Sequence, residues 1–173
     1  DIIELSSSMN LSVTFRAAGT SLSGQAISDS ILIITSRKFS NFKIANDASY
    51  ISLEPALTGA QVNGLLARYS KKIGPDPASI NAAMIGGIAA NNASGMCCGI
   101  SQNSYKTLKS MKLIFADGTK LDTACNESKD AFKKSHKEFL EQLKEFSRET
   151  KSNEELRAKI EKKFKIKNTC GYS

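Results

Sequence analysis

The sequence contains no tryptophan, one histidine and three prolines among its 173 residues. Its four cysteines, Cys97, Cys98, Cys125 and Cys170, form no Cys-x-x-Cys pair, which argues against a zinc site and a disulfide framework. We interpret them as small buried residues or free thiols, as expected in a reducing cytoplasm. No apolar run approaches the roughly 20 residues that cross a bilayer, and Asp1–Leu5 lack the features of a secretory signal.

The length and composition favour one folded domain with an appendage. Apolar residues make up 40% of the sequence, which is enough for a packed core and too many for general disorder. The first residue is not Met, and the sequence ends abruptly at Cys170-Gly171-Tyr172-Ser173. We therefore expect the chain to be a piece of a longer protein.

Positive charge is concentrated toward the C-terminus. The net charge is +7, of which residues 126–173 contribute +4 and the much longer stretch 1–125 contributes +3. A solvated helical surface is the simplest interpretation, and contact with acidic membrane lipid or with a redox partner stays open. Nucleic-acid binding is disfavoured, because acidic residues are mixed with the basic ones and no aromatic stacking pattern accompanies them.

Short apolar segments predict strands, and with the helices described below they indicate an α+β fold. Residues 11–15 alternate apolar and polar, and residues 31–34 are continuously apolar, as in a buried strand. Further strands are expected at residues 50–54, 111–115 and 120–123, the last two joined by an Asp117-Gly118 hairpin.

Helical periodicity appears in two regions. Residues 58–72 place apolar residues on one face, with Thr58 as the expected N-cap, and are ended by Gly74-Pro75-Asp76-Pro77. From about Ser128, apolar residues recur at helical spacing between charged ones, and a second helix is expected after the cap Asn153. The apolar positions of this charged helical pair are Phe132, Phe139, Leu140, Leu143 and Phe146, followed by Leu156, Ile160 and Phe164.

The first segment that could bind a ligand is a loop of small residues directly after a strand. It comprises Arg16, Ala17, Ala18, Gly19, Thr20, Ser21, Leu22, Ser23, Gly24 and Gln25. Without bulky side chains, the backbone N–H groups can approach an anion closely, and the hydroxyl groups and Arg16 add donors and charge. We predict that a pyrophosphate binds here. A plain connecting turn is the alternative, because the loop lacks the glycine patterns of an ATP loop and of a dinucleotide fold.

The second such segment lies between Gly74 and Gly99. Its predicted contact residues are Pro75, Asp76, Pro77, Ser79, Met84, Ile85, Gly86, Gly87, Ala90, Asn91, Ser94 and Gly95. Small residues again expose backbone to a flat partner, and the Asn and Ser side chains can donate to carbonyl or ribose oxygens. A tightly packed, small-residue helix start is an equally good interpretation of this segment alone.

Together, and in this order, the two segments resemble the FAD-linked oxidase family, whose flavin domain is of the p-cresol methylhydroxylase (PCMH) or vanillyl-alcohol-oxidase type. Arg16–Gly24 is similar to the family's pyrophosphate loop, and Phe115–Thr119 resembles the hairpin that follows its second cofactor segment. The resemblance implies a PCMH-type FAD-binding domain of two α/β subdomains over residues 1–125. A helical insertion at 126–165 and a return into the flavin domain at 166–173 would complete the chain.

Ser94–Gly99 and Gln102–Tyr105 are similar to one bacterial branch of this family. Its members are long D-2-hydroxyacid dehydrogenases, similar to D-lactate and D-2-hydroxyglutarate dehydrogenases and to glycolate oxidase, with an iron–sulfur module at the C-terminal end. The wider family has Gly-Gly at positions 94–95 and Lys-Tyr-Gly in the region 97–102, so contacts at 96–102 are not assigned. Cys97-Cys98-Gly99 is not a cluster-binding motif, because no other cysteine lies at ligand spacing.

This resemblance implies that a D-2-hydroxyacid passes a hydride to FAD, which then delivers electrons to another acceptor. Noncovalent FAD is expected, because neither segment contains the histidine that a covalent link would need. The family's substrate domain supplies the basic and metal-binding groups, so no catalytic residue and no metal ligand are assigned in this chain. An iron–sulfur cluster is expected only outside it.

Three further expectations complete the interpretation. His136, flanked by Lys134, Ser135 and Lys137, is expected to be a solvated surface residue. The protein is expected in the cytoplasm, with peripheral contact to the inner membrane left open. A noncatalytic nucleotide-binding or regulatory module with the same fold is the alternative to an enzyme.

Overall fold

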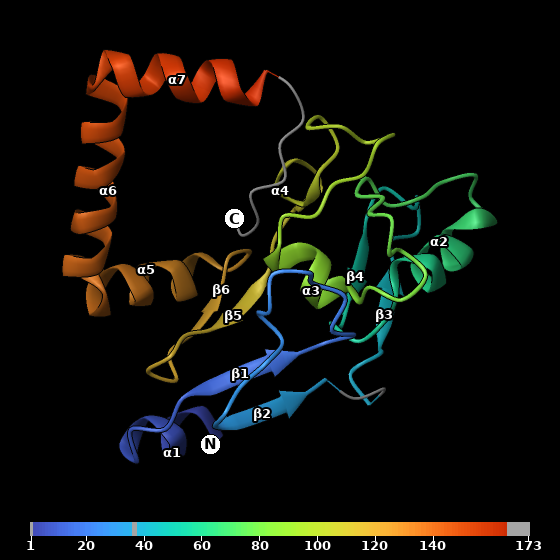
Figure 1. Cartoon of the computed structure of the whole chain (residues 1–173). Helices are drawn as coiled ribbons and strands as arrows, with labels where there is room; N and C mark the ends of the chain where they lie inside the picture. The colour runs from blue at the N-terminus through green and yellow to red at the C-terminus, as the bar shows by residue number, and fades with distance from the viewer. Residues whose placement is uncertain (1, 36–37, 166–173) are drawn as a thin grey trace. The chain divides into compact units, whose positions relative to one another are not determined.

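The computed structural model describes residues 2–35 and 38–165, which divide into two compact units. One unit is built on Glu4–Lys109, and the other begins at Ser110. Both helices and strands are present, which confirms the predicted α+β class (Figure 1). The predicted return into the flavin domain at residues 166–173 lies outside the described residues, and the domain boundary at residue 125 stays a prediction.

The first unit contains two small sheets and the helices that follow them. Strand β1 (Val13–Arg16) pairs in parallel with β2 (Ile31–Ile34), and β3 (Phe42–Ile44) pairs antiparallel with β4 (Ile51–Leu53). The helices are α1 (Ile2–Ser8), α2 (Gly59–Ala67), α3 (Ile85–Ala90) and α4 (Ser104–Thr107). Leu57, Val62 and Leu66 form the main core with the partly buried Ile44, Ile51, Leu53, Ile73 and Ile85.

The predicted strands β1, β2 and β4 are confirmed, whereas the prediction that 31–34 is a buried strand is wrong. Ile34 is 57% exposed, because β2 pairs only with β1 among the described strands and little covers its end. Strand β3 was not predicted.

The Thr58 cap is confirmed as a reciprocal capping box with Gln61, but α2 ends at Ala67 rather than at residue 72. Beyond it, Ser70 has a φ of +53°, which a right-handed helix excludes.

The second unit begins with the predicted hairpin. Strand β5 (Lys112–Ile114) pairs antiparallel with β6 (Lys120–Asp122). Gly118 has a φ of +85°, a conformation that strongly favours glycine at this turn. The Asp117 side chain accepts the backbone N–H of Thr119 at 2.9 Å and so closes the turn.

Three helices follow the hairpin, so the prediction of a helical pair is wrong in number. They are α5 (Asn126–Ser135), α6 (Lys137–Ser152) and α7 (Glu154–Phe164), and the chain changes direction sharply at each junction (Figure 1). Asn153 caps α7 as predicted, by accepting the Leu156 N–H at 2.9 Å. Among residues 2–35 and 38–165, no helix is long and apolar enough to span a membrane.

The break between α5 and α6 lies at His136, and its interpretation as a solvated residue is wrong. Its side chain is only 17% exposed and stacks on Phe132, with ring centroids 4.1 Å apart. Its Nδ1 lies 2.8 Å from the Ser135 hydroxyl, and its Nε2 lies 3.0 Å from a carboxylate oxygen of Asp117. His136 therefore joins the helix junction to the hairpin turn, and its backbone leaves the helical region at φ −118° and ψ 35°.

We expect Asp117→Asn to destabilise this junction at neutral pH. Hydrogen bonds from the backbone and hydroxyl of Thr119, followed by interactions with His136, lower the pKa of Asp117 below its ordinary 3.8. A carboxylate whose pKa is lowered by folding stabilises the fold above its unfolded pKa, and that contribution is lost as the pH falls through the folded pKa. Urea unfolding should therefore separate wild type from variant at neutral pH, and the difference should shrink as the pH falls through the folded pKa of Asp117. A difference that grows on acidification would contradict this assignment.

Candidate functional site

The first glycine-rich loop begins where β1 ends. Because β1 and β2 are parallel, Arg16 and Ile34 are partners at the carboxyl end of both strands. The chain must then leave the sheet and return, and residues 17–30 make this connection without helix or strand. Ligands commonly bind at the carboxyl ends of parallel strands, so this position suits a binding loop.

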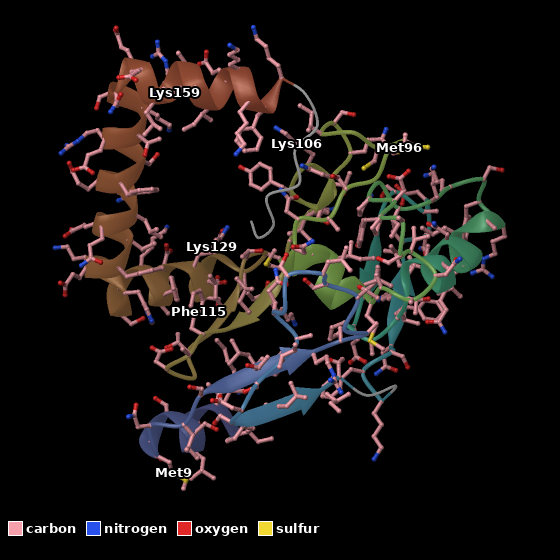
Figure 2. All side chains as sticks on the ribbon, in the orientation of Figure 1. Met9, Met96, Lys106, Phe115, Lys129 and Lys159 are labelled. Carbon is pink, nitrogen blue, oxygen red and sulfur yellow. The ribbon has the colours of Figure 1, made fainter. Side chains whose placement is uncertain are left out.

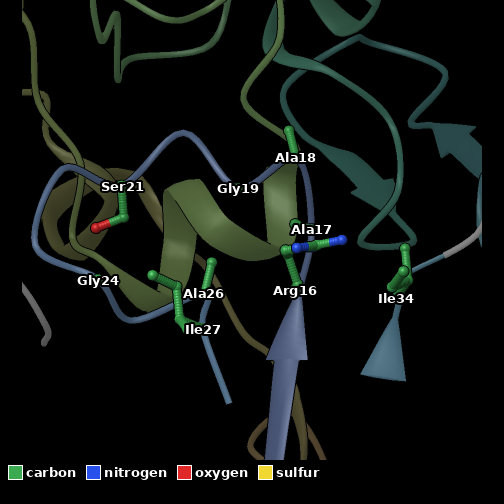
Figure 3. Close-up of a pocket in the computed structure, with 9 residues that line it drawn as sticks. All are labelled: Arg16, Ala17, Ala18, Gly19, Ser21, Gly24, Ala26, Ile27 and Ile34. Carbon is green, nitrogen blue, oxygen red and sulfur yellow. The ribbon is translucent and has the colours of Figure 1, made fainter. Parts of the chain in front are cut away.

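A pocket of about 390 Å³ lies within this loop (Figure 3). Arg16, Ala17, Ala18, Gly19, Ser21 and Gly24 line it, together with Ala26, Ile27 and Ile34. Six of the ten residues predicted for the loop therefore face one space. Thr20, Leu22, Ser23 and Gln25 do not line it, and the Leu22 side chain is fully exposed.

The backbone of this loop is rich in available donors. Among the described residues, no hydrogen bond joins the N–H groups of residues 18–22 to a protein acceptor, and all five residues are exposed. Gly19 and Gly24 have φ of +67° and +80°, so the backbone turns through conformations that side chains disfavour. Consecutive free N–H groups in such a turn form an anion-binding concavity.

Two side chains of the loop are engaged with each other. The Ser21 hydroxyl donates to the Gln25 side-chain oxygen, and the Ser23 N–H donates to the Ser21 oxygen at 3.4 Å. These contacts brace the loop internally. By contrast, Arg16 forms no ion pair with a carboxylate elsewhere in the described chain, so the only cation lining the pocket is available to an anionic ligand.

The second glycine-rich segment contains α3, whose start lies beside the first loop. Its start is anchored by backbone hydrogen bonds from Ile85 to Leu57 at 2.8 Å and from Gly86 to Pro55 at 3.0 Å. Gly86 is required by packing, because a Cβ there would lie 2.7 Å from the Pro55 Cβ. Gly86 therefore serves the fold, whereas its neighbour Gly87 is exposed.

Gly87 brings the two segments together. A Cβ on Gly87 would lie 3.7 Å from the Ala17 Cβ, and no other atom outside its own helix would approach within 4 Å. The start of α3 thus lies beside the first loop, close enough that a Cβ at position 87 would be in ordinary van der Waals contact with Ala17. A larger side chain at position 87 would enter the space next to the pocket.

The other predicted residues of the second segment have varied surroundings. Asp76 uses its carboxylate to accept the N–H groups of Cys97 and Cys98, each at 3.2 Å. Pro75 and Gly95 are buried, Ala90 and Asn91 are exposed, and Pro77, Ser79, Met84, Ile85 and Ser94 are partly buried. Their direct contact with a cofactor stays a prediction.

Sequence interpretation missed Ala26, Ile27 and Ile34 as pocket residues. Ile34 was assigned only to a strand, although parallel pairing with β1 would have placed it beside Arg16. Ala26 and Ile27 follow the loop and close the pocket from its far end, which depends on how the loop folds back. No local signal in the sequence marks them.

The residues present fit the diphosphate of a dinucleotide. The pocket offers free backbone donors, one arginine and an apolar wall, a combination typical of sites that bind an anion attached to a larger organic group. Within the described residues, no group of three His, Cys, Asp or Glu side chains is arranged to hold a metal ion.

Comparisons with known proteins agree with this assignment. A family model described as an FAD binding domain matches residues 1–124. A structure of alkyldihydroxyacetonephosphate synthase matches with a TM-score of 0.59 at 17% identity, covering 73% of this chain and 25% of that chain. Chitooligosaccharide oxidase matches with a TM-score of 0.59 at 15% identity, covering 75% of this chain and 27% of that chain. The chain thus spans about a quarter of these structures. No curated protein sequence gives a significant match.

Proposed function

The chain belongs to the family of FAD-binding domains, and on that premise we propose that it is the cofactor-binding part of a flavin-dependent dehydrogenase that oxidises a D-2-hydroxyacid. The observation that carries the binding role is the pocket at residues 16–34 with its free N–H groups and the adjacent Gly87. The substrate class rests on the similarity of Ser94–Gly99 and Gln102–Tyr105 to one branch of the family.

The chain's own residues bind and orient the cofactor. Backbone N–H groups of residues 18–22 and the Arg16 guanidinium would hold the diphosphate, and the absence of a side chain at Gly87 would leave room for the cofactor beside Ala17. Bound FAD would supply the acceptor for a hydride from the substrate carbon. We propose that the substrate and its proton acceptor are held by a domain outside this chain.

We further propose that FAD is held noncovalently and that the protein works in the cytoplasm or peripherally at the inner membrane. Neither glycine-rich segment contains histidine, which supports a noncovalent cofactor. Acid denaturation of the flavin-loaded protein should therefore release all of the flavin into the supernatant. Flavin that remains with the precipitated chain would contradict this proposal.

The enzyme proposal is tested by turnover. The full-length protein, supplied with FAD and an artificial dye acceptor, should reduce the dye with D-lactate or D-2-hydroxyglutarate and not with the L-enantiomers. Absence of dye reduction with every D-2-hydroxyacid, in protein that retains FAD, would instead favour a noncatalytic FAD-binding module.

A further inference from the structure

The loop that follows α3 is fastened to the Gly74–Pro77 segment by a compact set of contacts, which we call the Asp76 latch. Its members are Asp76, Gly95, Cys97 and Cys98. The two oxygens of the Asp76 carboxylate accept the N–H groups of Cys97 and Cys98, each at 3.2 Å. The Gly95 N–H donates to the Cys98 sulfur at 2.9 Å, so the turn is also closed on itself.

Gly95 is held too tightly for any other residue. A Cβ at this position would lie 1.8 Å from the Asp76 backbone oxygen and 1.9 Å from its side-chain Oδ1. The two segments therefore lie in close contact at this point, and a side chain at position 95 would force them apart. The Cys98 side chain is buried beneath this contact at 4% exposure, whereas Met96 projects from the turn at 93% exposure (Figure 2).

The carboxylate of Asp76 is charged when the latch is closed. Hydrogen bonding from Cys98, through its thiol and its backbone N–H, lowers the pKa of Asp76 below its ordinary 3.8 and outweighs the opposite effect of burial. Hydrogen bonds to a charged acceptor are stronger than those between neutral groups. At neutral pH the Asp76 carboxylate is therefore ionised, and its hydrogen bonds to Cys97 and Cys98 are of the stronger, charge-assisted kind.

The loop is also fastened at its two ends. The Ser104 hydroxyl donates to the Ile88 carbonyl at 2.9 Å, and the Asn92 side chain accepts the Tyr105 N–H at 2.9 Å. These bonds tie α4 to the carboxyl end of α3. The latch lies between these two ends, so residues 94–99 are held by hydrogen bonds within the protein.

We propose that Asp76 is a positioning residue, which holds the 95–98 turn against the Gly74–Pro77 segment and so preforms the second half of the FAD site. This inference rests on the proposed FAD-binding function. It gives Asp76 a role within the protein, because both of its carboxylate oxygens accept backbone N–H groups of the 95–98 turn. The hydrogen bonds of the latch should then both strengthen FAD binding and protect the Cys98 thiol from chemical labelling.

The test compares Asp76→Asn with Asp47→Asn in full-length protein that also carries Cys97→Ala. Asp47 is the matched control, because its carboxylate accepts the Ser49 N–H in an exposed turn of the same unit. An amide accepts through one oxygen and carries no charge, so Asp76→Asn should weaken FAD binding about tenfold. It should also speed maleimide labelling of Cys98 about tenfold, read by mass spectrometry. Asp47→Asn should change neither.

Linkage supplies a second readout in the wild-type latch. If a closed latch favours FAD, then FAD must favour the closed latch, and saturating FAD should slow Cys98 labelling. Gly95→Ala is a second variant that opens the latch from its other side, and it should reproduce both effects. If Asp76→Asn fails to fold, the FAD affinity and Cys98 labelling of Gly95→Ala test the positioning role instead.

The outcomes separate the two proposals. Equal FAD affinity in the Asp76→Asn variant and in its Cys97→Ala parent overturns the positioning role, while FAD binding itself stands. Unchanged Cys98 labelling in both latch variants overturns the latch. A wild type that binds no FAD overturns the proposed function and the positioning role together, and faster labelling in the variants would then show a purely structural latch.

Discussion

Gly87→Leu is expected to yield folded protein that has lost its flavin. The Cβ of residue 87 would lie 3.7 Å from Ala17, so the outer carbons of leucine would enter the space beside the pocket. Overpacking of a filled space costs about 1–3 kcal/mol, and we expect at least the upper end of that range where the leucine and the cofactor compete for the same space. We therefore expect FAD to bind at least about 100-fold more weakly, which abolishes its retention through purification. Flavin absorbance and titration of the apoprotein with FAD measure the effect.

Gly64→Leu is the matched control for this prediction. Gly64 is an exposed residue of α2, and no heavy atom lies within 4 Å of the position its Cβ would take. In both variants a helix gains a residue of better helix propensity, worth about 0.5–1 kcal/mol. Thermal unfolding should therefore show intact folds in both, and only Gly87→Leu should lose FAD. Unchanged FAD affinity in Gly87→Leu would show that the second segment is misassigned.

Arg16→Ala is expected to weaken FAD binding about 10- to 100-fold, because a charge-assisted hydrogen bond to the diphosphate contributes about 1.5–3 kcal/mol. Arg16 is the only cation among the residues that line the pocket. Screening weakens an exposed ion pair, so the gap between wild type and variant should narrow at high salt. FAD titrations at low and high ionic strength measure both effects.

Arg68→Ala controls for the general change in charge. Arg68 follows α2, its guanidinium lies over the Tyr69 ring at 4.8 Å, and it is not among the residues that line the pocket. The Arg68→Ala substitution removes one positive charge from the same unit as Arg16→Ala does. Equal loss of affinity in the two variants would mean that only net charge matters, and Arg16 would have no specific role.

Features set by neighbouring residues could be predicted from the sequence. The caps Thr58 and Asn153 and the Asp117-Gly118 turn depend on side chains within three residues, and all three are present. The chain forms a loop after β1, as predicted, because its Gly and Ser residues favour turns over continuation of the strand. Its donors are exposed because the loop has no strand or helix to pair with.

Contacts between distant residues could not be predicted. His136 was expected to be solvated, but its partner Asp117 is 19 residues away, and stacking on Phe132 completes its burial. The predicted contact of Asp76 with the cofactor stays a prediction, but its hydrogen bond with Cys98, 22 residues along the chain, was not foreseen. The meeting of Gly87 with Ala17 likewise depends on how α3 packs. A single sequence shows that such residues can form contacts, and only the fold decides which ones do.

Hydrogen–deuterium exchange on the full-length protein with and without FAD tests the central claim most directly. The account predicts that FAD slows exchange of the backbone amides in residues 16–25 and 84–95, since both segments lie against the bound cofactor. The N–H groups of residues 18–22 should change most, because they have no acceptor among the described residues. Protection confined to other parts of the protein, with both glycine-rich segments unchanged, would contradict the assignment of the FAD site.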